Sequence, residues 1–111
     1  MNWRLDVANP ERRRGVYKVP GGKLVAVELS VVDERLRDVV VTGDFFLYPE
    51  EALPVLSVAI EDAPATIDRA SLASRIAAAI PANVELVGAT PESLAIAVER
   101  ALGSPEPDIA S

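Results

Sequence analysis

Apolar and polar residues alternate with the period of β-strands over residues 16–42. Three runs, at residues 16–19, 23–32 and 35–42, carry this alternation and are separated by polar or glycine-rich turns, which is typical of an antiparallel meander. A spacing of three residues between Leu36 and Val39 interrupts the third run and predicts a β-bulge near residues 37–38. The residues predicted to face the core are Val25, Val27, Leu29, Val31, Leu36, Val39 and Val41.

Beyond residue 48 the period lengthens to that of α-helices. The pattern predicts helices near residues 51–61, 68–80 and 91–102, with a short strand or extended loop at residues 84–87. Pro54 suits only the first turn of a helix, so the first regular helix should begin close to it or kink there. Thr90 is the expected N-cap of the third helix. The residues predicted to point inward are Leu53, Leu56, Ile60, Leu72, Ala73, Ile76, Ala77, Ile80, Leu94, Val98, Ala101 and Leu102.

Strands that precede helices in this way indicate an α+β fold. We predict a small antiparallel three-stranded sheet with the helices packed on one face. Residues 1–15 are interpreted as an N-terminal basic arm, residues 16–103 as the folded domain, and residues 104–111 as a flexible tail. Such a length corresponds to one domain that can bury a core without metal or disulfide staples.

Charge is distributed unevenly along the chain. The net charge is −6, yet residues 1–23 hold six basic against two acidic residues, and the remainder holds five basic against fifteen acidic ones. An acidic body of this kind argues against general nucleic-acid binding. No apolar run is long enough to cross a bilayer, and no leader pattern precedes the strands, so we expect a cytoplasmic protein that does not act at a membrane.

Histidine and cysteine are both absent from the chain. Their absence removes the commonest general base, the thiolate nucleophile and the usual transition-metal ligands. We therefore expect neither catalytic residues nor a metal site, and the chain should not perform chemistry alone.

One candidate binding element is the turn between the first two strands, which reads Lys18-Val19-Pro20-Gly21-Gly22-Lys23. Proline followed by glycine favours a tight turn. Its amide groups and flanking lysines could meet an anion such as phosphate. The run could instead be an ordinary hairpin turn with solvated lysines. The chemistry of these residues alone favours this second interpretation.

A second candidate is the connection between the last strand and the first helix. It holds Gly43, Asp44, Phe45, Phe46 and Tyr48. So many large apolar residues in a loop indicate that it packs on something. One phenylalanine could close the end of the core while the other docks a partner, and both interpretations stay open.

A basic run at residues 12–14 is a further, weaker candidate. It could bind phosphate or an acidic partner, but a solvated arm is the favoured interpretation.

Two segments carry a resemblance to a known family. KVPGGKL at residues 18–24 and GDFFLYPEE at residues 43–51 resemble the C-terminal accessory domain of lipoate–protein ligases, which in some members is a separate small subunit. The resemblance spans about residues 16–102 and implies a fold similar to that of iron–sulfur scaffold proteins, without the cysteines that those scaffolds need. Lys18, Pro20, Gly21, Gly22, Lys23, Gly43, Asp44, Phe45, Phe46 and Tyr48 would then face the partner or the adenylate.

The same resemblance implies a role. In this family a catalytic large subunit activates lipoate with ATP and magnesium to lipoyl-adenylate and passes the acyl group to a lipoyl-domain protein. The accessory part supports the activation step, binds no cofactor alone, and meets the lipoyl domain only indirectly. The alternative is a general docking module for another enzyme, unrelated to lipoate.

Overall fold

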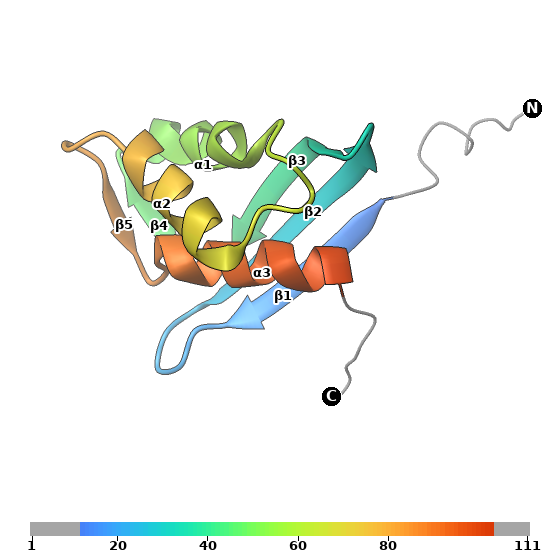
Figure 1. Ribbon diagram of the computed structural model, residues 1–111. Coiled ribbons are helices and arrows are strands. Elements are labelled where there is room, and N and C mark those ends of the chain that lie inside the picture. Colours follow the sequence, from blue (N-terminus) through green and yellow to red (C-terminus); the bar gives the residue numbers. More distant parts are fainter. Residues whose placement is uncertain (1–11, 104–111) are drawn as a thin grey trace, which may run out of the picture.

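The computed structural model describes residues 12–103, which form an α+β fold (Figure 1). A three-stranded antiparallel sheet has the order β1-β2-β3, and a separate two-stranded antiparallel sheet pairs β4 with β5. A single turn of 3-10 helix at Glu50–Ala52 precedes α1. The elements are β1 (Arg13–Lys18), β2 (Leu24–Val32), β3 (Arg35–Gly43), β4 (Phe46–Tyr48), α1 (Leu53–Ile60), α2 (Arg69–Ala79), β5 (Glu85–Val87) and α3 (Pro91–Gly103).

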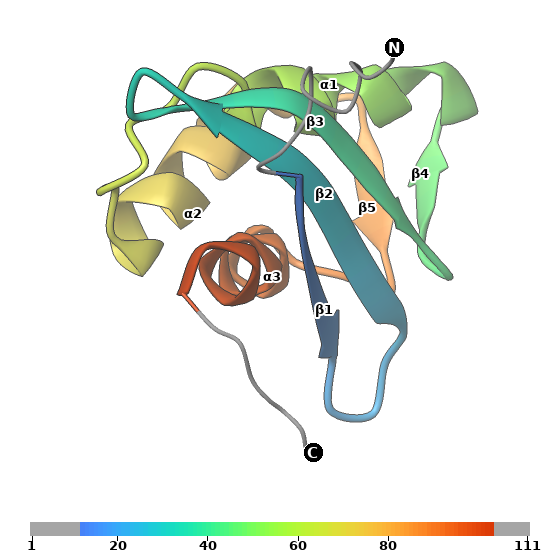
Figure 2. The ribbon, with the colours of Figure 1, turned by 90° about the vertical axis from the view of Figure 1, so that its right-hand side faces the viewer.

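The helices lie on one side of the larger sheet, as predicted (Figures 1 and 2). Helix α3 packs on β1 and β2, α1 packs on β3, and α2 contacts both other helices. Within residues 12–103, no helix covers the opposite face of the sheet.

The N-terminal boundary of the sheet differs from the prediction. Strand β1 begins at Arg13, three residues earlier than expected, so Arg13 and Arg14 belong to the sheet and not to an arm. Gly15 explains why the strand extends this far: a Cβ atom there would overlap the carbonyl oxygen of Ala97 and the amide nitrogen of Ala101. Close contact with α3 therefore fixes this part of β1. Residues 1–11 and 104–111 of the predicted arm and tail lie outside the described residues.

The predicted bulge in β3 is confirmed. The pairing of β2 with β3 shifts register between Glu28 and Ser30, and Asp38 adopts a positive φ of 54°. The carboxylate of Glu61 accepts hydrogen bonds from the amides of Asp38 and Val39, both at 3.1 Å. Amides that the bulge exposes at the strand edge are thus satisfied by the residue that follows α1.

Side chains fix the starts of the three helices and the end of α1. Pro54 lies in the first turn of α1, as predicted, and Arg75 closes the other end by donating to the carbonyl oxygens of Ala59 and Glu61. Asp68 caps α2 by accepting from the amide and hydroxyl of Ser71, which lowers the pKa of its carboxyl group. Thr90 caps α3, as predicted, by accepting from the amide of Ser93 at 3.0 Å.

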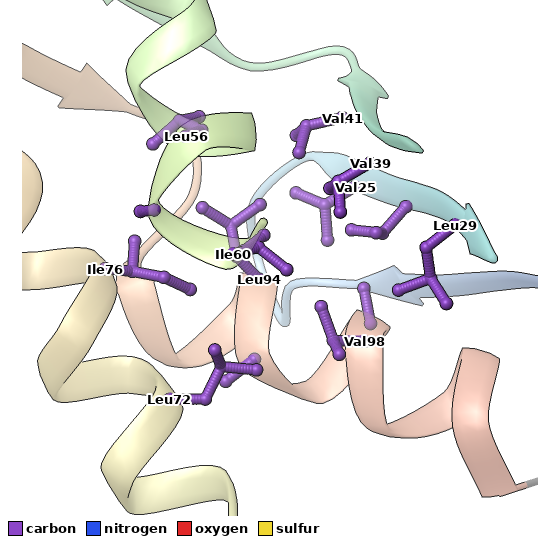
Figure 3. Packing of buried hydrophobic residues seen from close by; sticks show 14 of the residues in the cluster. Val25, Leu29, Val39, Val41, Leu56, Ile60, Leu72, Ile76, Leu94 and Val98 are labelled. Atoms are coloured by element: carbon purple, nitrogen blue, oxygen red, sulfur yellow. The ribbon is translucent and has the colours of Figure 1, made fainter. Parts of the chain in front are cut away.

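The core lies between the sheet and the helices (Figure 3), where most of the predicted inward residues are found. Two predicted positions are wrong. Leu53 is 41% exposed, because the buried stripe runs through Ala52 and Leu56 and leaves Leu53 at its margin. Ala77 is exposed, because α2 touches its neighbours mainly through Leu72 and Ile76. Fully buried residues include Val25, Val27, Leu29, Leu36, Leu56, Ile60, Leu72, Ile76, Leu94 and Val98.

Candidate functional site

The segment predicted as a loop after Gly43 contains a strand instead. Residues 46–48 form β4 and pair with β5, so that Phe46 lies opposite Val87 and Tyr48 opposite Glu85. The sequence prediction missed the pairing because the partner strand lies some forty residues away in the chain. The available signal was the run of aromatic and apolar residues at positions 45–48, which is typical of a short strand.

Alternation gives the two phenylalanines different roles. Phe45 is 8% exposed and belongs to the core, whereas Phe46 is 53% exposed on the outer side of β4. Phe45 therefore closes the end of the core, as one interpretation held, and Phe46 is exposed to solvent.

The outer side of the small sheet carries three exposed apolar or aromatic side chains beside exposed Glu85, which lies opposite Tyr48. Phe46, Tyr48 and Val87 are all exposed there, and we call these three residues the aromatic face. A two-stranded sheet on its own is only marginally stable in water, and exposing large aromatic rings to water is unfavourable unless another surface covers them. These side chains are accordingly available for contact with another molecule.

The turn between β1 and β2 is tight, as its sequence predicted. The amide of Gly22 donates to the carbonyl oxygen of Val19 at 2.7 Å, and Gly21 has a positive φ of 69°. The amide of Lys23 donates to the carbonyl oxygen of Gly88 at 3.3 Å. Because the amides of Gly22 and Lys23 already donate within the chain, these two amides are not free to bind an anion.

Both sequence motifs meet at one end of the domain. The amide of Asp44 donates to the carbonyl oxygen of Leu24 at 3.0 Å, which joins the second motif to the start of β2. Gly88 also lies against both motifs, because a Cβ atom there would be 2.7 Å from Cγ of Lys23 and 3.5 Å from Cα of Phe45. Gly88 follows Val87 directly, so this junction lies beside the aromatic face. Sequence reasoning did not single out Gly88, because it stands in neither motif.

The two lysines of the turn lie on different sides of the hairpin. Lys18 pairs with Leu24 across β1 and β2, on the face of the sheet opposite α1, α2 and α3. Lys23 precedes Leu24 by one residue and, with the alternation of extended chain, extends toward Gly88. Of the two, only Lys23 therefore lies beside the aromatic face. Pro20, Gly21 and Asp44 are exposed near this end of the domain.

The basic run at residues 12–14 is not a free arm. A guanidinium nitrogen of Arg12 donates to the carbonyl oxygen of Asp38 at 2.7 Å, and Arg13 donates to the carbonyl oxygen of Leu102 at 3.0 Å. Arg14 lies 3.4 Å from the carboxylate of Glu28. The run is therefore part of the sheet and its contacts. No helix within residues 12–103 is long and apolar enough to cross a membrane.

Comparison with known proteins gives one structural likeness. No protein-family profile and no curated protein sequence matches the chain. Among solved structures, the fold is similar to a chain from an archaeal lipoylation system of Thermoplasma acidophilum, described as a bipartite lipoate protein ligase and its E2 lipoyl domain. The two chains share 22% identity with a TM-score of 0.58, over 78% of this chain and 91% of the other. This chain therefore shares the α+β fold of that chain.

Proposed function

We propose that this chain is the accessory subunit of a two-part lipoate–protein ligase. In this proposal it supports ATP-dependent activation of lipoate to lipoyl-adenylate by a separate catalytic subunit. The observation that carries the proposal is the aromatic face, whose exposed rings and neighbouring Lys23 form a surface suited to docking. The fold shared with a chain of a bipartite lipoate ligase system supports the choice of partner.

The chemistry of activation explains why a second chain is useful. An acyl-adenylate hydrolyses when water reaches it, so a subunit that closes over the site protects the intermediate and orders the reacting groups. Tyr48 and Phe46 supply large apolar surfaces that exclude water, and Lys23 supplies a positive charge for the phosphates of ATP. The catalytic subunit would hold lipoate, ATP and magnesium. This chain would contribute contacts from the aromatic face and Lys23.

Omitting the chain tests the proposal directly. With the cognate catalytic subunit, lipoate, ATP and magnesium, formation of lipoyl-adenylate should be fast with this chain and slow without it, and this chain alone should form none. Release of pyrophosphate measures the step. Activation at full rate without the chain would leave the general docking module as the better account.

The structural likeness is also compatible with a second role, which the same reaction mixture tests. The similar structure contains an E2 lipoyl domain as well as the ligase, so the chain could instead be an acceptor of the lipoyl group. Mass spectrometry of this chain after the reaction distinguishes the two, because an acceptor gains a lipoyl group on lysine. The accessory role requires Lys18 and Lys23 to stay unmodified.

Lys23→Ala should slow the activation step and spare the transfer step. The physical reason is that Lys23 lies near the aromatic face and would contact the β- and γ-phosphates of ATP, which are present during activation and have left as pyrophosphate before transfer. Loss of one charge-assisted contact of this kind should slow activation roughly 10-fold. Transfer is measured separately, from premade lipoyl-adenylate to a lipoyl domain.

Arg69→Ala is the matched control for that substitution. It also removes one positive charge, but from an exposed ion pair with Glu99 between α2 and α3. If Lys23→Ala slows both steps equally, the lysine aids docking and has no specific role toward the departing pyrophosphate.

A further inference from the structure

We propose that the aromatic face binds a basic, apolar surface of the catalytic subunit, and that carboxylates around the face select that surface. The inference deepens the proposed function and rests on it, because it names the chemistry of the partner surface that covers Phe46 and Tyr48. Four exposed acidic residues carry these carboxylates, and we call them the acidic rim. They are Asp44, Glu50, Glu51 and Glu85.

Strand pairing places one carboxylate of the rim on the aromatic face itself. Glu85 of β5 lies opposite Tyr48 of β4, and cross-strand partners project from the same side of an antiparallel sheet. Phe46 and Val87 form the next outward pair, because alternate residues of a strand share a side. A cation that pairs with Glu85 therefore also reaches the ring of Tyr48, and aromatic rings attract cations through their faces.

The other carboxylates of the rim flank β4 in the chain. Asp44 lies two residues before Phe46, and Glu50 and Glu51 open the turn of 3-10 helix that follows Tyr48 and Pro49. That turn contacts β4. Both ends of β4 therefore carry exposed negative charge next to the aromatic rings.

Few basic side chains are available to neutralise the rim. The chain holds no lysine or arginine over residues 38–68 or 76–99, and β4, the 3-10 turn and β5 all come from these two segments. Within residues 12–103, none of the four carboxylates takes part in an ion pair. Lys23 lies at the other end of the face, beside Gly88. Uncompensated negative charge is therefore concentrated at the Tyr48 end, where it attracts a cationic surface.

Charge decides which occupant the aromatic face fits. A second copy of this chain would bring two acidic rims together, and like charges across an interface disfavour binding. Anionic lipid surfaces are repelled for the same reason. A protein surface with arginines or lysines among apolar side chains is attracted, because its apolar part covers the rings while its cations pair with the rim.

Reversal of single charges in the rim tests this inference. The rates of association and dissociation between the full chain and its cognate catalytic subunit are measured by surface plasmon resonance, at low and at high salt. Glu85→Lys and Glu51→Lys should each weaken binding roughly 10-fold or more, mainly through slower association. Added salt should weaken binding of the wild-type chain more than binding of either variant.

Glu34→Lys is the matched control. Glu34 is an exposed glutamate outside the ion pairs of residues 12–103, and its reversal changes the net charge equally. It lies in the turn between β2 and β3, at the end of β3 away from β4 (Figure 1), so the affinity should stay close to that of the wild type. Equal weakening by Glu34→Lys would overturn the proposal, since net charge alone would then explain the effect.

Two other results would also overturn it. One is wild-type affinity in both rim variants, and the other is a dimer of the chain alone that Phe46→Ala dissociates, as seen by sedimentation. Unfolding midpoints check that the variants stay folded. Glu51→Gln replaces a reversal variant whose midpoint falls, and it should weaken binding less than a full reversal does.

The outcomes separate this inference from the proposed function. If the wild-type chain does not bind the catalytic subunit, both fail. If it binds and supports activation while the rim variants behave as the wild type, only the basic partner surface is wrong. If binding depends on the rim and on salt but activation proceeds at full rate without the chain, only the accessory role is wrong.

Discussion

Gly15→Ala should destabilise the domain by at least about 3 kcal/mol, which corresponds to a fall in Tm of roughly 12 °C or more for a domain of this size. At this position the backbones of β1 and α3 are in direct contact. The added methyl group would overlap the carbonyl oxygen of Ala97 and the amide nitrogen of Ala101. Both atoms belong to the backbone of α3, so no side-chain rotation can relieve the overlap. Strand and helix must separate, which opens the core that Leu29 and Val98 share.

Gly103→Ala is the control for this substitution. Gly103 ends α3, and a Cβ atom there has no neighbour within 4 Å, so its replacement should leave the unfolding midpoint nearly unchanged. Denaturant unfolding followed by circular dichroism compares the two variants. Midpoints of Gly15→Ala and the wild type within error of one another would show that β1 does not pack against α3 in this way.

Phe46→Ala and Tyr48→Ala should each weaken the complex with the catalytic subunit by roughly 30-fold or more. Aromatic residues at the centre of an interface commonly lose at least about 2 kcal/mol of binding free energy when truncated, and that loss corresponds to this factor. Both side chains are more than half exposed in the free domain, so their removal leaves the core intact. Isothermal titration calorimetry with the catalytic subunit measures the effect, and unfolding midpoints check that the variants stay folded.

Two comparisons make that result specific. Val58→Ala removes an apolar side chain that is 71% exposed on α1, away from β4, and should leave the affinity unchanged. Phe45→Ala should instead lower stability, because Phe45 is buried in the core. If Phe46→Ala and Tyr48→Ala bind as tightly as Val58→Ala, the aromatic face is not the docking surface.

Local sequence determined the elements of the larger sheet and the helices. Alternation of period two placed Val25, Val27 and Leu29 inward, and a break in that alternation located the bulge, because both features depend on neighbouring residues alone. Proline and the capping residue Thr90 likewise act on the backbone within one helical turn, so the starts of α1 and α3 were predictable.

Tertiary structure alone decided the parts that depend on distant contacts. Strand β4 exists because β5 pairs with it across some forty residues, and the start of β1 depends on the contact of Gly15 with α3. The sequence named the residues around Lys23 and Phe45, but the junction at Gly88 that brings them together arises only on folding. Segregation of Lys18 from Lys23 has the same origin. Lys23 is one residue before Leu24, the cross-strand partner of Lys18, and such neighbours project from opposite faces of an extended chain. Only the packing of the helices decides which of the two faces they cover.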